Sequence, residues 1–160
     1  MPNFLEQLVA EWYEFQGFFV RRNVKVGKLA KGGYESELDI VAFNPDERRL
    51  VHIEPSMDAD SWEKREYRYA KKFDAGRKYI PGLFKRFGEL PEIEQVAVFV
   101  FGNRKLQPKI GGGSVLHISS LMNDIRLNVA SKKVAIEVIP EQFVILRSLQ
   151  FASNYWEVTQ

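Results

Sequence analysis

The sequence contains no cysteine, which excludes disulfides, thiolate zinc sites and cysteine nucleophiles. Only two histidines, His52 and His117, are present, so a multi-histidine metal site is not expected. No apolar run approaches the ~18 residues of a membrane-spanning helix. The opening residues lack the basic and apolar regions of a signal peptide. We therefore expect a protein of the reducing cytoplasm that has no membrane-spanning helix.

The composition is that of a globular protein: 45% of the 160 residues are hydrophobic and 28% are charged. This length suits a single domain over residues 1–160. Hydrophobic spacing and turn residues predict, in chain order, a helix at 4–16, strands at 18–24, 37–44 and 50–56, a helix at 60–79, strands at 95–101 and 114–118, a helix to 129, a strand at 133–139 and a final helix from Pro140. This order predicts an α/β fold in which a central mixed β-sheet is flanked by helices.

Two carboxylates, Asp39 and Glu54, lie in apolar strand-like runs on either side of the turn at 44–47. A buried carboxylate costs several kcal/mol unless it is paired, protonated or bound to a cation. Antiparallel pairing of the two strands could bring Asp39 opposite Glu54, and two such groups suit Mg²⁺ or Mn²⁺. The alternative is a pair of exposed strand residues, or a salt bridge to Arg21 or Lys25.

The order of these residues resembles the PD-(D/E)xK, or restriction-endonuclease-like, superfamily over roughly residues 4–101. Its pattern is a glutamate in the first helix, an aspartate on the second strand and Glu-x-Lys on the third. Asp39 and Glu54 match the strand acids. Glu6 precedes Gly17 by eleven residues, which is similar to the spacing in the Mrr-like and Holliday-junction-resolvase-like branches; Glu11 is the rival helix acid. The resemblance implies a restriction-endonuclease-like three-layer domain that hydrolyses DNA phosphodiester bonds with Mg²⁺ or Mn²⁺.

The sequence departs from this pattern at Ser56, where the motif lysine is expected. In the superfamily, that lysine orients or deprotonates the attacking water and steadies the charge on the phosphate. Serine offers a hydroxyl but no positive charge. The following helix supplies two replacements, Lys64 and Lys72. Because this helix follows Glu54 directly, we expect its basic edge to run away from the carboxylates, with Lys64 nearest in chain distance and Lys72 two turns farther along.

Basic residues concentrate between 64 and 78 and in the glycine-rich segment 27–33, although the net charge is only +2. Such residues suit phosphate-backbone contacts with duplex or branched DNA, and the alternative is an ordinary solvated face. The candidate nucleic-acid contacts are Lys28, Lys31, Arg65, Arg68 and Lys72. A catalytically inactive nucleic-acid-binding descendant, or an accessory protein completed by a second copy or a partner subunit, is the alternative to a nuclease. Both histidines are expected to be structural.

Overall fold

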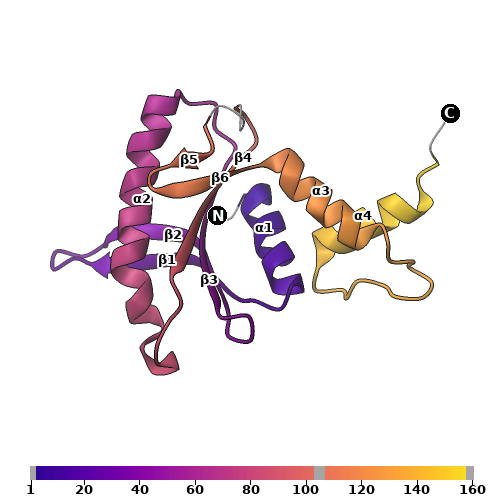
Figure 1. Ribbon diagram of the computed structural model, residues 1–160, viewed down its shortest axis with the longest axis horizontal. Helices are drawn as coiled ribbons and strands as arrows, with labels where there is room; N and C mark the ends of the chain where they lie inside the picture. Colours follow the sequence, from indigo (N-terminus) through magenta and orange to yellow (C-terminus); the bar gives the residue numbers. More distant parts are fainter. Residues whose placement is uncertain (1–2, 103–106, 158–160) are drawn as a thin grey trace. The chain divides into compact units, whose positions relative to one another are not determined.

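The computed structural model describes residues 3–102 and 107–157 (Figure 1). The chain divides into two compact units, Met1–His117 and Ile118–Gln160. We call them the N-terminal and C-terminal units. Each has its own secondary structure and is described by itself.

The N-terminal unit is built on a six-stranded mixed sheet with the order β1-β2-β3-β4-β6-β5. Its strands are β1 (Phe19–Lys28), β2 (Tyr34–Asn44), β3 (Arg49–Ser56), β4 (Ile93–Phe99), β5 (Lys109–Ile110) and β6 (Gly113–His117). Strands β3, β4 and β6 are parallel, whereas β1, β2 and β3 form an antiparallel meander and β5 is antiparallel to β6. The predicted α/β fold with a mixed sheet is therefore confirmed.

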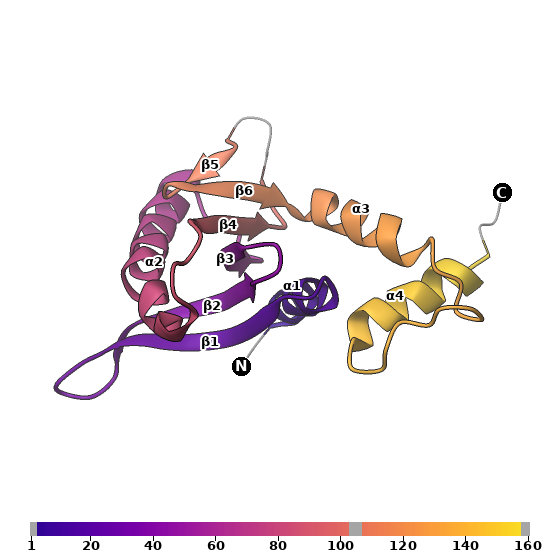
Figure 2. The same ribbon diagram turned by 60° about the horizontal axis from the view of Figure 1, so that its bottom comes forward.

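Helices cover both faces of this sheet: α1 (Phe4–Phe15) lies on one and α2 (Trp62–Leu83) on the other (Figures 1 and 2). Asn3 caps α1 by accepting a hydrogen bond from the backbone N–H of Glu6. Ser61 caps α2 by accepting a hydrogen bond from the backbone N–H of Lys64. Helix α2 continues four residues past its predicted end at 79, through Pro81 to Leu83, and is followed by the short 3₁₀ helix η1 (Lys85–Phe87). Pro81 has no N–H to donate to the carbonyl of residue 77, so one helical hydrogen bond is lost, and the helix ends two residues later at Leu83.

The strands β2 and β3 separate part-way along their length. Their pairing ends at Ile40 and Ile53, but β2 continues beside β1 to Tyr34 and β3 continues beside β4 to Ser56. Beside this point, Asn23 on β1 has a left-handed φ of 52°, a conformation that asparagine tolerates better than most residues. The backbone groups that face the opening between β2 and β3 must therefore find partners other than the sheet ladder.

The C-terminal unit contains α3 (Ile118–Val129) and α4 (Val144–Tyr155). The predicted strand at 133–139 is wrong, because this segment forms turns and irregular backbone. Its polar backbone groups bond to side chains of α4 instead of to a neighbouring strand. Gln150, which is fully buried, accepts from the N–H of Ile139 at 2.9 Å and donates to the carbonyl of Glu137 at 2.9 Å, and Asn154 accepts from the N–H of Val134 at 3.1 Å.

None of the helices in the described parts of the chain is both long enough and apolar enough to cross a membrane.

Candidate functional site

Asp39 and Glu54 meet at the opening between β2 and β3. They occupy the next position beyond the Ile40–Ile53 pair, and the backbone N–H of Asp39 donates to Glu54 Oε1 at 3.2 Å. The Glu54 side chain thus accepts a bond that would otherwise be lost from the ladder where the strands part. Glu54 is completely buried, whereas 15% of the Asp39 side chain is exposed. The antiparallel arrangement predicted from the turn at 44–47 therefore brings the two carboxylates together.

Lys72 reaches both carboxylates from α2. Its Nζ lies 3.0 Å from Asp39 Oδ2 and also bonds Glu54 Oε2. The chain geometry explains why Lys72, rather than a residue of the first turn, arrives here. Because β3 and β4 are parallel, the connecting helix must run back along the sheet, antiparallel to β3. Its third turn passes over Glu54, so the expectation that this edge runs away from the carboxylates is wrong for Lys72.

The electrostatics of the cluster follow from two carboxylates meeting one ammonium group. Burial, together with the neighbouring Glu54 carboxylate, raises the pKa of Asp39 from 3.8 to about 7, although Lys72 opposes the shift. Burial alone would lower the pKa of Lys72, but the charges of Glu54 and Asp39 outweigh it and raise that pKa. The ammonium therefore stays charged at neutral pH, while one carboxylate remains incompletely neutralised.

This donor set fits a divalent cation that prefers oxygen ligands. Asp39 and Glu54 each present a carboxylate oxygen toward one point, which is the point that Lys72 Nζ contacts. Within residues 3–102 and 107–157, no group of three acidic, histidine or cysteine side chains is close enough to hold a metal by itself. Mg²⁺ commonly takes one or two protein carboxylates and fills its other positions with water and phosphate oxygens. Asp39 and Glu54 would hold such an ion.

Glu6 lies close enough to the cluster to interact with it electrostatically. Partial burial and the charge of Asp39 raise the pKa of Glu6, and Lys72 acts in the opposite direction. The Glu6 carboxylate also accepts from Asn3 Nδ2 at 2.7 Å, so it serves the cap of α1 as well. The rival acid Glu11 is buried and accepts from Gln7 Nε2 at 3.4 Å. Because Glu6 interacts electrostatically with Asp39, it is the better candidate for the helix acid.

Ser56, which occupies the motif position, and Lys64, the other candidate replacement for the lysine, lie elsewhere. The Ser56 hydroxyl bonds the Asp58 carboxylate and accepts from the backbone N–H of Asp58 at 3.1 Å, so it stabilises the turn after β3. Lys64 is exposed in the first turn of α2, where its backbone N–H donates to the Ser61 cap.

The predicted nucleic-acid contacts fall into two groups. Arg65 is only 4% exposed; it donates to Asp58 and, at 2.9 Å, to the carbonyl of Phe101, so it holds the connection between β3 and α2. Arg68 is half-buried and pairs with the same aspartate. By contrast, Lys28 at the end of β1 and Lys31 in the following turn are exposed, on a hairpin that extends beyond α2 (Figures 1 and 2).

Two further residues of the site, His52 and Gln95, were not predicted from the sequence. His52 was assigned a structural role, yet its Nε2 lies 2.8 Å from Glu54 Oε1. Its position two residues before Glu54 on the same strand was the available signal, because alternate strand residues share a face. Gln95 contacts the other side of the His52 ring at 3.1 Å. It lies on β4, and its pairing with His52 follows from a parallel register that no local pattern specifies.

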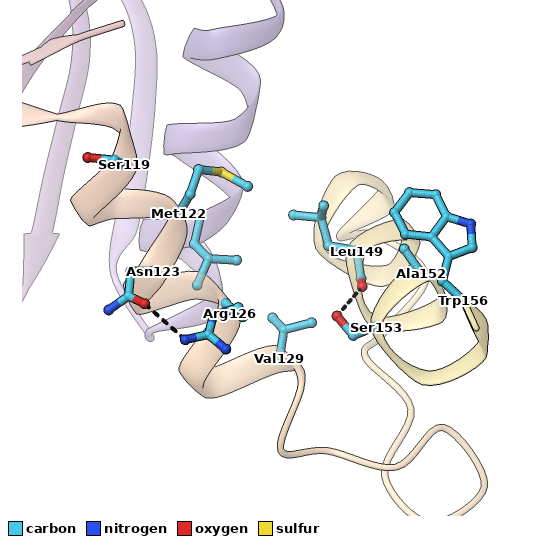
Figure 3. A pocket seen from close by; sticks show the side chains of 10 residues that line it. Ser119, Met122, Asn123, Arg126, Val129, Leu149, Ala152, Ser153 and Trp156 are labelled. Atoms are coloured by element: carbon cyan, nitrogen blue, oxygen red, sulfur yellow. Dashed lines mark hydrogen bonds between the residues drawn. The ribbon is translucent and has the colours of Figure 1, made fainter. Parts of the chain in front are cut away.

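The C-terminal unit contains a hollow of about 490 Å³ between α3 and α4 (Figure 3). Apolar side chains dominate its lining, among them Met122, Val129, Leu149 and Trp156, and Arg126 at its edge donates to Asn123 Oδ1 at 3.2 Å. It offers apolar contacts rather than the convergent charges of the Asp39–Glu54–Lys72 cluster.

No family model matches the sequence, and no curated protein matches it at a significant level.

Proposed function

We propose that this protein is a metal-dependent nuclease that hydrolyses DNA phosphodiester bonds, with a restriction-endonuclease-like fold and a PD-(D/E)xK-type site whose lysine has moved to α2. The observation that carries the proposal is the contact of Lys72 Nζ with both Asp39 and Glu54. The residue at position 56 is serine, but a lysine still reaches the paired carboxylates. A strand pair with two acids, a helix that supplies a cation and a second acid on α1 together support this function better than a purely structural ion pair.

The residues would divide the chemistry as follows. Asp39 and Glu54 would hold Mg²⁺ or Mn²⁺, which when bound polarises a phosphoryl oxygen and acidifies water. Lys72 would orient the attacking water and offset the negative charge that develops on the phosphate. Glu6, which is coupled to Asp39, would orient a water molecule at the same place. Partial exposure of Asp39 and Lys72, at 15% and 28%, leaves these groups accessible to a substrate.

The proposed DNA contacts are sequence-independent. Lys28 and Lys31 at the hairpin, with exposed Lys71 on α2, would bind phosphates and place the backbone beside the cluster. Arg65 would act indirectly, by fixing the start of α2 through Asp58.

Cleavage of supercoiled plasmid with Mg²⁺, with Mn²⁺ and with EDTA tests this function. We expect metal-dependent nicking by the wild type and a loss of about a hundredfold or more in the Asp39→Ala and Lys72→Ala variants. Lys64→Ala is the matched control, since it removes an exposed lysine from the same helix. DNA binding measured in EDTA should change little in Lys72→Ala. Cleavage at the wild-type rate by Asp39→Ala or Lys72→Ala would refute the proposal.

One observation favours a second function, a catalytically inactive nucleic-acid-binding protein. The Lys72 ammonium contacts the carboxylate oxygens that a metal would need, so the cluster is already partly neutralised without one. In that case the wild type would bind DNA but neither cleave it nor take up Mn²⁺ in calorimetry.

A further inference from the structure

The buried side of Glu54 is held by a chain of hydrogen bonds that runs from α2 through β4 to β3. Arg77 bonds Gln95 Oε1, Gln95 Nε2 lies 3.1 Å from His52 Nδ1, and His52 Nε2 lies 2.8 Å from Glu54 Oε1. We call these four residues the Glu54 relay. His52, Glu54 and Gln95 are all buried, so each polar atom depends on its partner in the relay rather than on water.

The direction of every bond in the relay is fixed by its ends. A guanidinium can only donate, so the atom of Gln95 that faces Arg77 must be its oxygen. The Gln95 amide nitrogen then points to the carbonyl of Phe73, at 2.8 Å, and to His52 Nδ1. A nitrogen that receives an N–H cannot carry a proton of its own, so the proton of the neutral ring resides on Nε2. That proton is directed at Glu54 Oε1.

A glycine in the middle of α2 permits this arrangement. A Cβ at Gly76 would collide with His52 Nδ1 and would lie 2.9 Å from Gln95 Nε2. Glycine in a helix interior costs roughly 1 kcal/mol relative to alanine. Its presence at this point lets the imidazole and the amide pack directly against the helix backbone. The edge of the Phe73 ring system completes the enclosure, at 5.4 Å between the ring centroids of His52 and Phe73.

We propose that His52 is a positioning residue for Glu54, which it orients so that Oε1 is fully bonded and Oε2 alone faces the cation. Oε1 receives the His52 proton and the N–H of Asp39, whereas Oε2 contacts Lys72. Glu54 would therefore meet a metal through one defined oxygen. This inference rests on the proposed function, since it specifies how one of the metal-binding carboxylates is held.

The proposal is tested first by Mn²⁺ titration calorimetry on the full chain. Loss of a residue that orients a metal ligand typically weakens metal binding about 10- to 100-fold. We expect that loss in His52→Leu, and partial recovery in His52→Gln, whose side-chain amide can still donate near the position of Nε2. His117→Leu, which removes the other histidine, is the control. Affinity for DNA in EDTA should be the same in all four proteins, whereas a general loss of structure would lower it. Equal Mn²⁺ affinity in the wild type and a folded His52→Leu variant would overturn the proposal.

A second measurement needs no variant and no metal. In ¹⁵N NMR of the wild type at neutral pH, His52 should show a bare Nδ1 and a protonated Nε2. A proton on Nδ1 would overturn the proposal, because Glu54 would then receive no bond from the ring. If the wild type takes up no Mn²⁺, the proposed function fails, and the NMR result still decides whether His52 holds Glu54.

Discussion

The raised pKa of Asp39 leads to a quantitative prediction about stability without metal. The folded protein binds a proton at Asp39 up to about pH 7, whereas the unfolded chain releases it near the ordinary value of 3.8. A raised carboxyl pKa stabilises the fold at low pH, and that stability is lost as the pH rises through the folded pKa. Linkage then gives a decrease of about 2.5 kcal/mol in the free energy of unfolding between pH 5 and pH 8 from this group alone.

The Asp39→Asn variant isolates this contribution, because it keeps the shape of the side chain and removes the titration. Its stability relative to the wild type should rise by about 2.5 kcal/mol from pH 5 to pH 8 in EDTA. Burial lowers the pKa of His52 to about 3, so the contribution of this residue to stability rises with pH. The wild type and Asp39→Asn share this contribution, and it cancels in the difference between them. Urea unfolding at the two pH values measures the effect. A difference that does not change with pH would refute the electrostatic description of the cluster. Saturating Mg²⁺ should stabilise the wild type at pH 8 and leave Asp39→Asn unchanged.

Three further outcomes follow from the structure. Ser56→Lys, which restores the motif lysine, should retain or raise plasmid cleavage, and a complete loss would indicate that the turn after β3 cannot release its bonds to Asp58. The double variant Lys28→Glu/Lys31→Glu should weaken DNA binding and flatten the slope of log K against log salt; an unchanged slope would remove the hairpin from the interface. Gly111→Ala should destabilise the protein by about 2 kcal/mol or more, because its Cβ would lie 2.5 Å from the backbone nitrogen of Ala70 on α2. Gly32→Ala is the matched control in chemical denaturation: its φ is also positive, at 90° against 55° for Gly111, but its Cβ would have no neighbour within 4 Å.

The carboxylate pair was predictable because it depends on short-range features. The turn at 44–47 joins two strands, and an antiparallel register puts residues at equal distances from the turn side by side. The mixed sheet was likewise predictable from the order of apolar runs. Neither inference requires knowledge of how distant segments pack.

The sequence alone left two candidates, Lys64 and Lys72, for the lysine that replaces the motif residue. The choice depends on the length of the connection after β3 and on the direction in which α2 crosses the sheet, and both are tertiary properties. Chain distance favoured Lys64, whereas the return path of the helix selects Lys72. The prediction of a strand at 133–139 was wrong for a related reason. Alternation of apolar residues predicts a strand, but Gln150 supplies the hydrogen bonds that a neighbouring strand would have provided.

The placement of Lys72 on α2 changes what a recognisable relative of this protein would look like. In the Glu-x-Lys motif the lysine follows its glutamate by two positions on the same strand, so the two residues form one short contiguous sequence motif. Here the lysine follows Glu54 by eighteen positions, across a loop and three helical turns. Insertions in that loop would rotate or displace the helix, so its length becomes part of the signature. A useful search pattern would join Asp39, His52 and Glu54 to a lysine at this spacing and to Gly76 four residues later, and would leave position 56 free to vary.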